Sequence, residues 1–170
     1  MPIEIILAGT FAGFLALFWL TPVGIPTLKR FGRGQMSPDL KFSYGAEETY
    51  QLLEAYGPRG VAHWRRMLWL DMVFPGVYAA LFALLAMDWA SWVDAEPIWR
   101  LLAMSCPILA GVSDYIENVF LLAILATLPK RTPARVVAAS AFTTAKHLFG
   151  WATLAIPLLH WGSRWLGWIG

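Results

Sequence analysis

The chain has 170 residues, of which 58% are hydrophobic and only 14% are charged, and its mean hydropathy is +0.56. Because soluble domains carry about 25% charged residues, this composition excludes an ordinary soluble domain and indicates one integral membrane domain over residues 1–170. The net charge of +2 gives no indication of nucleic-acid binding. The single cysteine, Cys106, excludes an internal disulfide and a cysteine-cluster metal site.

The first apolar run predicts a transmembrane helix over about residues 3–28. Residues 3–20 alone just reach the roughly 17–25 residues that a span requires, and the prolines and glycine that follow predict an irregular end. No basic leader or small-residue cleavage site accompanies this run, so we expect a retained helix rather than a signal peptide. The spacing of Gly9 and Gly13 predicts a groove that packs against another helix of the same chain.

The polar stretch over residues 29–66 predicts a long connection that contains one short amphipathic helix over about residues 46–56. Glu47 and Glu48 suit its first turn, and Gly57-Pro58 is its stop signal. Its apolar stripe consists of Ala46, Tyr50, Leu53 and Tyr56. Such a helix lies on the lipid headgroups or forms a lid over the mouth of a site, and the sequence leaves both interpretations open.

Three further transmembrane helices are predicted over about residues 67–90, 98–128 and 135–160. The predicted fold is therefore all-α, a four-helix transmembrane bundle with the amphipathic helix between the first and second spans. In the helix over 67–90, Pro75 removes the hydrogen bond to the carbonyl of Asp71 and predicts a kink.

Charge asymmetry predicts how the chain crosses the membrane. Two connections hold most of the basic residues: Lys29, Arg30, Arg33, Lys41, Arg59, Arg65 and Arg66 in one, and Lys130, Arg131 and Arg135 in the other. This asymmetry predicts a multi-pass protein of the cell membrane, with both basic connections cytoplasmic and both termini on the opposite side. Tryptophans typical of a membrane boundary gather on that opposite side: Trp89, Trp92, Trp99, Trp161, Trp165 and Trp168.

A polar face interrupts the apolar run over residues 98–128. Asp114, Glu117 and Asn118 are spaced i, i+3, i+4 and so share one face of a helix. Counted from the cytoplasmic helix ends at 1.5 Å per residue, Glu117 and Lys146 both lie roughly 16 Å deep. We therefore expect one cluster, in the inner half of the bundle, of Asp71, Tyr78, Asp114, Glu117, Asn118, Thr143, Lys146 and His147.

The free-energy cost of placing charged groups at membrane depth indicates a functional role for this cluster. Each charged residue at the membrane centre costs about 2.5–3.5 kcal/mol, so four isolated ones would cost on the order of 10 kcal/mol. With His147 neutral, the carboxyls outnumber the ammonium group of Lys146, so we expect a protonated carboxyl or a bound cation. A protonated carboxyl beside an ionised one is suited to acid–base catalysis.

The candidate catalytic residues are Asp71, Asp114, Glu117 and Lys146, and the candidate ligand-binding residues are Tyr78, Asn118, Thr143 and His147. Asp114 or Glu117 is the candidate proton donor or acceptor, and Lys146 is the charge partner. The alternatives are a structural polar network and a divalent metal bound by Asp71, Asp114, Glu117 and His147. Because no second histidine stands at ligand spacing, no metal is assigned, and no cofactor can be named.

Several motifs resemble those of a family of small, uncharacterised four-helix integral membrane proteins. They are Tyr44…Glu47…Leu52…Gly57-Pro-Arg-Gly60, Leu70-Asp71-x-x-Phe74-Pro75-x-x-Tyr78, Asp114-Tyr115-x-Glu117-Asn118 and Ala139-Ser140-x-x-Thr143-x-x-Lys146. The resemblance implies a shared fold and one site at these polar positions, but it brings no reaction. A looser similarity in layout, to the emopamil-binding and sterol-isomerase proteins, is an analogy of fold alone.

Three classes of function follow from these observations. The first is binding or acid–base processing of a lipophilic small molecule that enters from the lipid bilayer. The second is a non-catalytic accessory subunit of a larger membrane complex or homo-oligomer, and the third is a proton- or cation-coupled transporter or channel. The first predicts an apolar-walled pocket that touches Asp114 and Glu117, the second a fully satisfied polar network, and the third a hydrated path from both sides.

Overall fold

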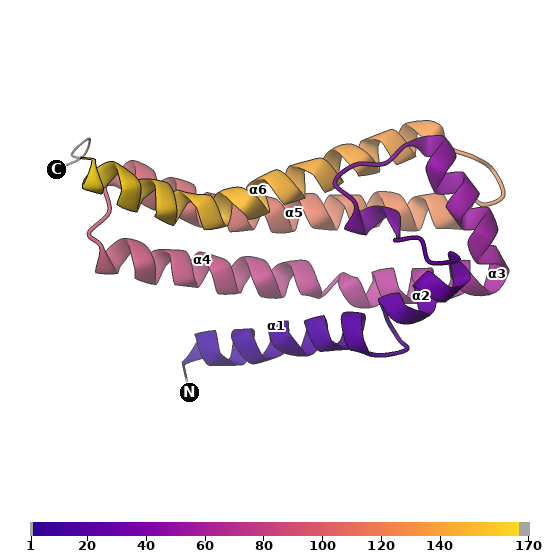
Figure 1. Ribbon diagram of the computed structural model, residues 1–170, viewed down its shortest axis with the longest axis horizontal. Coiled ribbons are helices and arrows are strands. Elements are labelled where there is room, and N and C mark those ends of the chain that lie inside the picture. Colours follow the sequence, from indigo (N-terminus) through magenta and orange to yellow (C-terminus); the bar gives the residue numbers. More distant parts are fainter. Residues whose placement is uncertain (1, 167–170) are drawn as a thin grey trace.

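A computed structural model describes residues 2–166, which fold entirely into helices and connections, without strands in this part of the chain. The elements are α1 (Ile3–Leu20), α2 (Ile25–Phe31), the 3₁₀-helix η1 (Pro38–Leu40), α3 (Ala46–Asp71), α4 (Phe74–Trp92), α5 (Pro97–Thr127) and α6 (Pro133–Trp165). Helices α1, α4, α5 and α6 run side by side, and α3 crosses one end of the bundle (Figure 1). The start of α1 and the end of α6 both lie toward the other end of the bundle, on opposite sides of α4 in this view (Figure 1).

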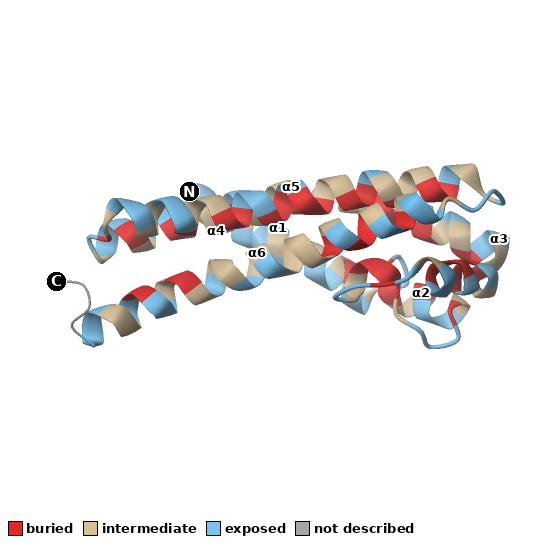
Figure 2. Cartoon of the chain, turned by 90° about the horizontal axis from the view of Figure 1, so that it is seen from above, coloured by how far each residue is buried: buried red, intermediate tan, exposed pale blue. Residues whose placement is uncertain are grey.

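Helix α5 is the centre of the bundle, since it packs against both α4 and α6, while α1 packs against α4. Gly111 permits the close approach of α4 and α5. A Cβ atom at this position would lie 2.8 Å from the Cβ of Ala79 and 3.0 Å from the carbonyl oxygen of Pro75. Small residues serve the same purpose in other membrane bundles. Buried residues recur along α5, and exposed residues alternate with them around the long helices (Figure 2).

Three helical stretches are long and apolar enough to cross a membrane: Ile3–Phe31, Ala46–Trp92 and Pro97–Thr127. Helix α6 is less apolar because Lys146, His147 and several threonines lie in its middle. It nevertheless packs along α5, with Thr143 fully buried against that helix. The protein is thus a membrane-embedded helical bundle, in which polar groups of the last helix face inward, as the energetics of a bilayer require.

The second predicted span differs from its expected bounds. The chain is already helical from Pro58, which suits a first helical turn because its missing N–H needs no partner there. Gly57, with φ of 59° and ψ of −177°, breaks α3 where the stop signal was predicted. A second break separates α3 from α4 just before Pro75. Met72 and Val73 keep right-handed helical backbone angles across this break, and Ala46–Trp92 forms one stretch long and apolar enough to span a membrane. The predicted kink before Pro75 is therefore confirmed, whereas the predicted start near residue 67 is wrong, because the helix begins at Pro58.

The first span also differs, since α1 ends at Leu20 and the chain turns before α2 begins. The expected packing of Gly9 and Gly13 within the chain is wrong, because no atom lies within 4 Å of a Cβ built on either glycine. Both glycines lie on an exposed face of α1. Helices α5 and α6 lie close to their predicted bounds, although α6 continues to Trp165, and Trp168 falls outside the described residues.

The first part of α3, which corresponds to the predicted amphipathic helix, packs across the ends of α5 and α6. Tyr50, Leu53 and Tyr56 are buried there, as the apolar stripe requires. Arg131, in the connection between α5 and α6, pairs with Glu47 at 3.1 Å and with Glu54 at 2.7 Å. This helix therefore closes one end of the bundle and is held there by charge pairs at its outer surface.

Candidate functional site

The polar face of α5 points into the bundle at the level of α4 and α6. Asp114 is 6% exposed, and Glu117 and Asn118 are fully buried. Their spacing on one helix presents the two carboxyls to α6 and the amide to the end of α3. The burial of such groups is costly unless they are paired, so their partners determine what the cluster can do.

Lys146 of α6 lies between the two carboxyls of α5. Its Nζ atom is 3.0 Å from Oδ1 of Asp114 and 2.5 Å from Oε2 of Glu117. The ammonium group is thus the shared partner of two buried acids one helical turn apart. In a low-dielectric interior, the loss of such a partner leaves uncompensated charge, which is strongly destabilising.

Two further hydrogen bonds connect α5 to the second span. The Tyr78 hydroxyl of α4 donates to Oδ2 of Asp114 at 3.1 Å. The Asn118 side-chain amide donates to Oδ2 of Asp71 at 2.8 Å. Asp71 is the last residue of α3, where a carboxylate is unfavourable beside the helix dipole. Asp71 lies at the break before Pro75, and its carboxyl accepts the hydrogen bond from the Asn118 amide of α5.

Thr143 of α6 completes the surroundings of Glu117. Its hydroxyl oxygen is 2.5 Å from Oε1 of Glu117 and 3.0 Å from the carbonyl oxygen of Ala139. A hydroxyl carries one proton, so it donates to one of these two acceptors at a time. A protonated Glu117 satisfies both contacts, because Glu117 then donates to Thr143 while Thr143 donates to Ala139. The geometry thus accommodates a proton on this acid.

The connection between α2 and α3 supplies two residues that lie outside the predicted cluster of eight. The backbone N–H of Tyr44 donates to the Ser140 hydroxyl at 2.9 Å, and the Tyr44 hydroxyl lies 3.4 Å from Oε1 of Glu117. Asp39 of η1 is 8% exposed, and its Oδ1 atom has no hydrogen-bond partner among the described residues. Burial raises the pKa of Asp39, although the nearby Lys146 opposes this effect.

The two residues differ in the signal that could have revealed them. Tyr44 belongs to one of the motifs that carry the family resemblance, so the motif already associated it with the site. Asp39 had no such signal. It lies in a connection whose polar sequence predicts exposure to solvent. Asp39 is buried because this connection folds back against the bundle. Burial also raises the pKa of Tyr44, and the charge of Glu117 adds to this effect.

His147 lies at the edge of the cluster rather than within it. Its Nδ1 atom is 2.8 Å from the carbonyl oxygen of Thr143, and its ring lies near the rings of Phe42 and Trp151. Among the described residues, no group of three or more histidines, cysteines and acids is arranged to hold a metal ion. The alternative of a divalent metal on Asp71, Asp114, Glu117 and His147 therefore has no support in the geometry.

A cavity of about 450 Å³ reaches the cluster from the side of the bundle. Its walls come from α1, α4, α5, α6 and η1: Phe11, Trp19, Asp39, Leu40, Phe74, Tyr78, Ala110, Asp114, Lys146, His147, Gly150 and Trp151. A smaller hollow of about 100 Å³ extends it to Asp71. The predicted contact between the pocket and Glu117 is wrong, because Glu117 is fully buried and lines neither hollow. A ligand in the cavity meets Asp114 and Lys146 first.

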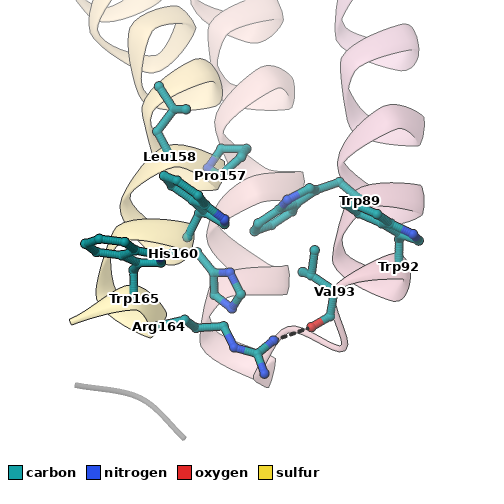
Figure 3. Close-up of a pocket in the computed structure, with 9 residues that line it drawn as sticks. Trp89, Trp92, Val93, Pro157, Leu158, His160, Arg164 and Trp165 are labelled. Atoms are coloured by element: carbon teal, nitrogen blue, oxygen red, sulfur yellow. Dashed lines mark hydrogen bonds between the residues drawn. The ribbon is translucent and has the colours of Figure 1, made fainter. Parts of the chain in front are cut away.

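A hollow of about 510 Å³ lies at the opposite end of the bundle, between the ends of α4 and α6 (Figure 3). His160 is buried there between the rings of Trp89 and Trp99, with its Nε2 atom 3.4 Å from Glu96. Arg164 donates to the carbonyl oxygen of Val93 (Figure 3). This hollow is lined mainly by tryptophans and other apolar residues and touches no paired acids, so it belongs to the aromatic boundary of the bundle.

Comparisons of the chain with models of protein families, with curated proteins and with solved structures gave no match. The resemblance to four-helix membrane proteins therefore stays an expectation that rests on the motifs. Function has to be argued from the geometry of the Asp114–Lys146 cluster and the cavity beside it.

Proposed function

We propose that this protein binds a lipophilic small molecule from the bilayer and carries out acid–base chemistry on its polar head. The observation that carries the proposal is the cavity of about 450 Å³ that brings Asp114 and Lys146 to an otherwise mostly apolar wall. Apolar pockets with a few convergent polar groups are the usual form of small-molecule sites. Carboxyl and ammonium groups at membrane depth are costly, and they mark functional sites by default.

The positions of the acids assign them different roles in this proposal. Asp114 lines the cavity and is the group that exchanges a proton with the ligand. When its carboxylate takes a proton, an O–H bond forms on Asp114, one X–H bond of the ligand breaks, and the electron pair stays with the ligand. Lys146 stabilises the resulting negative charge. Glu117 lies behind Lys146 and acts as a positioning residue that holds the ammonium group.

Unpaired acceptors favour a ligand over a purely structural network. Asp39 Oδ1 and Asn118 Oδ1 are buried and lack hydrogen-bond partners among the described residues. A network retained only for packing in an accessory subunit is expected to satisfy its buried polar atoms. Of these two acceptors, Asp39 Oδ1 belongs to a residue that lines the cavity, where it suits a head group that brings a hydrogen-bond donor.

Binding of 1-octanol, whose hydroxyl is a neutral donor, to the purified protein in lipid nanodiscs tests this proposal. The probe joins an apolar chain to a donor head, and Asp114→Asn removes the charge while keeping the shape. We expect the variant to bind at least tenfold more weakly, since a charged hydrogen bond contributes about 1.5–3 kcal/mol. Asp88→Asn, at an exposed position of α4, is the matched control and should bind as wild type. Equal binding by wild type and a folded Asp114→Asn variant would overturn the proposal.

A further inference from the structure

A second, apolar hollow of about 130 Å³ adjoins the cavity at the cluster. Tyr78, Ala110 and Gly150 line both spaces. The smaller hollow continues between α4, α5 and α6, away from α3, and its remaining walls are Phe82, Pro107, Thr153 and Leu154. The Thr153 hydroxyl donates to the carbonyl oxygen of Phe149, so it does not require a ligand partner. The cavity that holds Asp114 and Lys146 and the smaller apolar hollow therefore meet at the three shared residues.

Gly150 keeps this junction open. No atom lies within 4 Å of a Cβ built at this position, in contrast to Gly111, where a Cβ would meet α4. Glycine inside a helix is less favourable than alanine by roughly 1 kcal/mol, and neither close packing nor a left-handed backbone requires it here. Gly9 and Gly13 are equally free of neighbours, but they face away from the bundle and line neither space.

The dimensions of the apolar hollow restrict its occupant. Its volume of about 130 Å³ is far below the roughly 300–1,000 Å³ of pockets that enclose drug-sized ligands. From Tyr78 to Phe82, and likewise from Gly150 to Leu154, its walls span one helical turn, or about 6 Å. A straight hydrocarbon chain fits such a space, whereas a fused ring system does not.

We propose that this hollow is a tail-binding subsite, entered past Gly150, for the linear hydrocarbon chain of an amphiphile whose head lies at Asp114. The inference rests on the function proposed above and adds the class of ligand: a single-chain amphiphile rather than a polycyclic one. Gly150 is then the residue that determines which tails enter.

Photolabelling tests the subsite. The probe is 1-octanol that carries a diazirine at the end of its chain, applied to the protein in nanodiscs, with the labelled residues identified by peptide mass spectrometry. In wild type we expect labelling of Phe82, Pro107 and Leu154. Gly150→Leu fills the entrance and should reduce this labelling at least tenfold, and Gly150→Ala should reduce it by less. Gly13→Leu makes the same change on an exposed face and should label as wild type.

The outcomes separate this inference from the proposed function. If Asp114→Asn abolishes labelling but both Gly150 variants label as wild type, the tail subsite is wrong and the proposed function stands. If labelling is the same in wild type and Asp114→Asn, the proposed function itself fails. Should Gly150→Leu not fold, Gly150→Ala decides alone, since alanine favours the helix, and unchanged labelling in this variant would overturn the subsite.

Discussion

The two ends of this bundle both contain hollows, yet they are built differently. At the end nearer α3, Lys146 pairs with two buried acids, and Oδ1 of Asp39 has no hydrogen-bond partner among the described residues beside a cavity of about 450 Å³. At the other end a larger hollow of about 510 Å³ is lined mainly by tryptophan rings, with one buried imidazole beside one carboxyl. The comparison teaches that the size of a hollow does not identify a site, whereas charge at membrane depth does.

The largest expected effect comes from Lys146→Met, which removes the shared partner of Asp114 and Glu117. Because two buried carboxyls lose their counter-charge, the free energy of unfolding should fall by about 3–5 kcal/mol at neutral pH. Unfolding in mixed detergent micelles measures this change. A loss below about 1 kcal/mol would show that these acids are already neutral or hydrated without the lysine, and the contrast between the two ends would weaken.

Tyr78→Phe should have the next largest effect. It removes the donor to Oδ2 of Asp114 without changing the shape of the cavity wall. A hydrogen bond to a charged group contributes about 1.5–3 kcal/mol, so we expect a loss of stability in this range and weaker binding of 1-octanol. Isothermal titration in nanodiscs measures the binding, and unchanged values of both quantities would remove Tyr78 from the site.

His160→Phe is the corresponding change at the tryptophan end. The new ring keeps the packing between Trp89 and Trp99 but loses the contact with Glu96. We expect a loss of about 1 kcal/mol in stability and no change in 1-octanol binding. Binding that fell as far as in Asp114→Asn would contradict the assignment of function to one end only.

The smallest expected effect concerns pH and Asp39. Burial raises the pKa of this acid in the folded state above its unfolded value of about 3.9. The folded state then retains the proton while the unfolded state loses it, so stability falls as pH rises above about 4. Asp39→Asn removes this contribution, and its stability relative to wild type should increase from pH 4 to pH 7. A constant difference across this range would contradict the burial of a protonatable Asp39.

Much of the fold and part of the site could be predicted from the sequence. The spacing of Asp114, Glu117 and Asn118 defines one helix face, and the helical rise places Lys146 at the same depth. Both predictions depend only on the local geometry of an α-helix. The connection between α2 and α3 folds back against the bundle, and its sequence carries no periodic pattern that would indicate this. The burial of Asp39 therefore could not be predicted.

The misplaced helix boundaries have a similar cause. The polar residues before residue 67 favour a connection, but the helix of the second span already begins at Pro58, because proline suits a first helical turn. The spacing of glycines likewise does not indicate which face of a helix packs against another helix. Gly9 and Gly13 were expected to pack within the chain, yet the glycine that permits close packing of α4 and α5 is Gly111.

The most direct test of the central claim is an experimental structure of the protein in lipid nanodiscs, at a resolution that shows ordered small molecules. We expect elongated non-protein density in the cavity, with its polar end within hydrogen-bond distance of Asp114 and Lys146. A cavity filled by the protein's own side chains, with every buried acceptor around Asp114 satisfied from within the chain, would contradict the account.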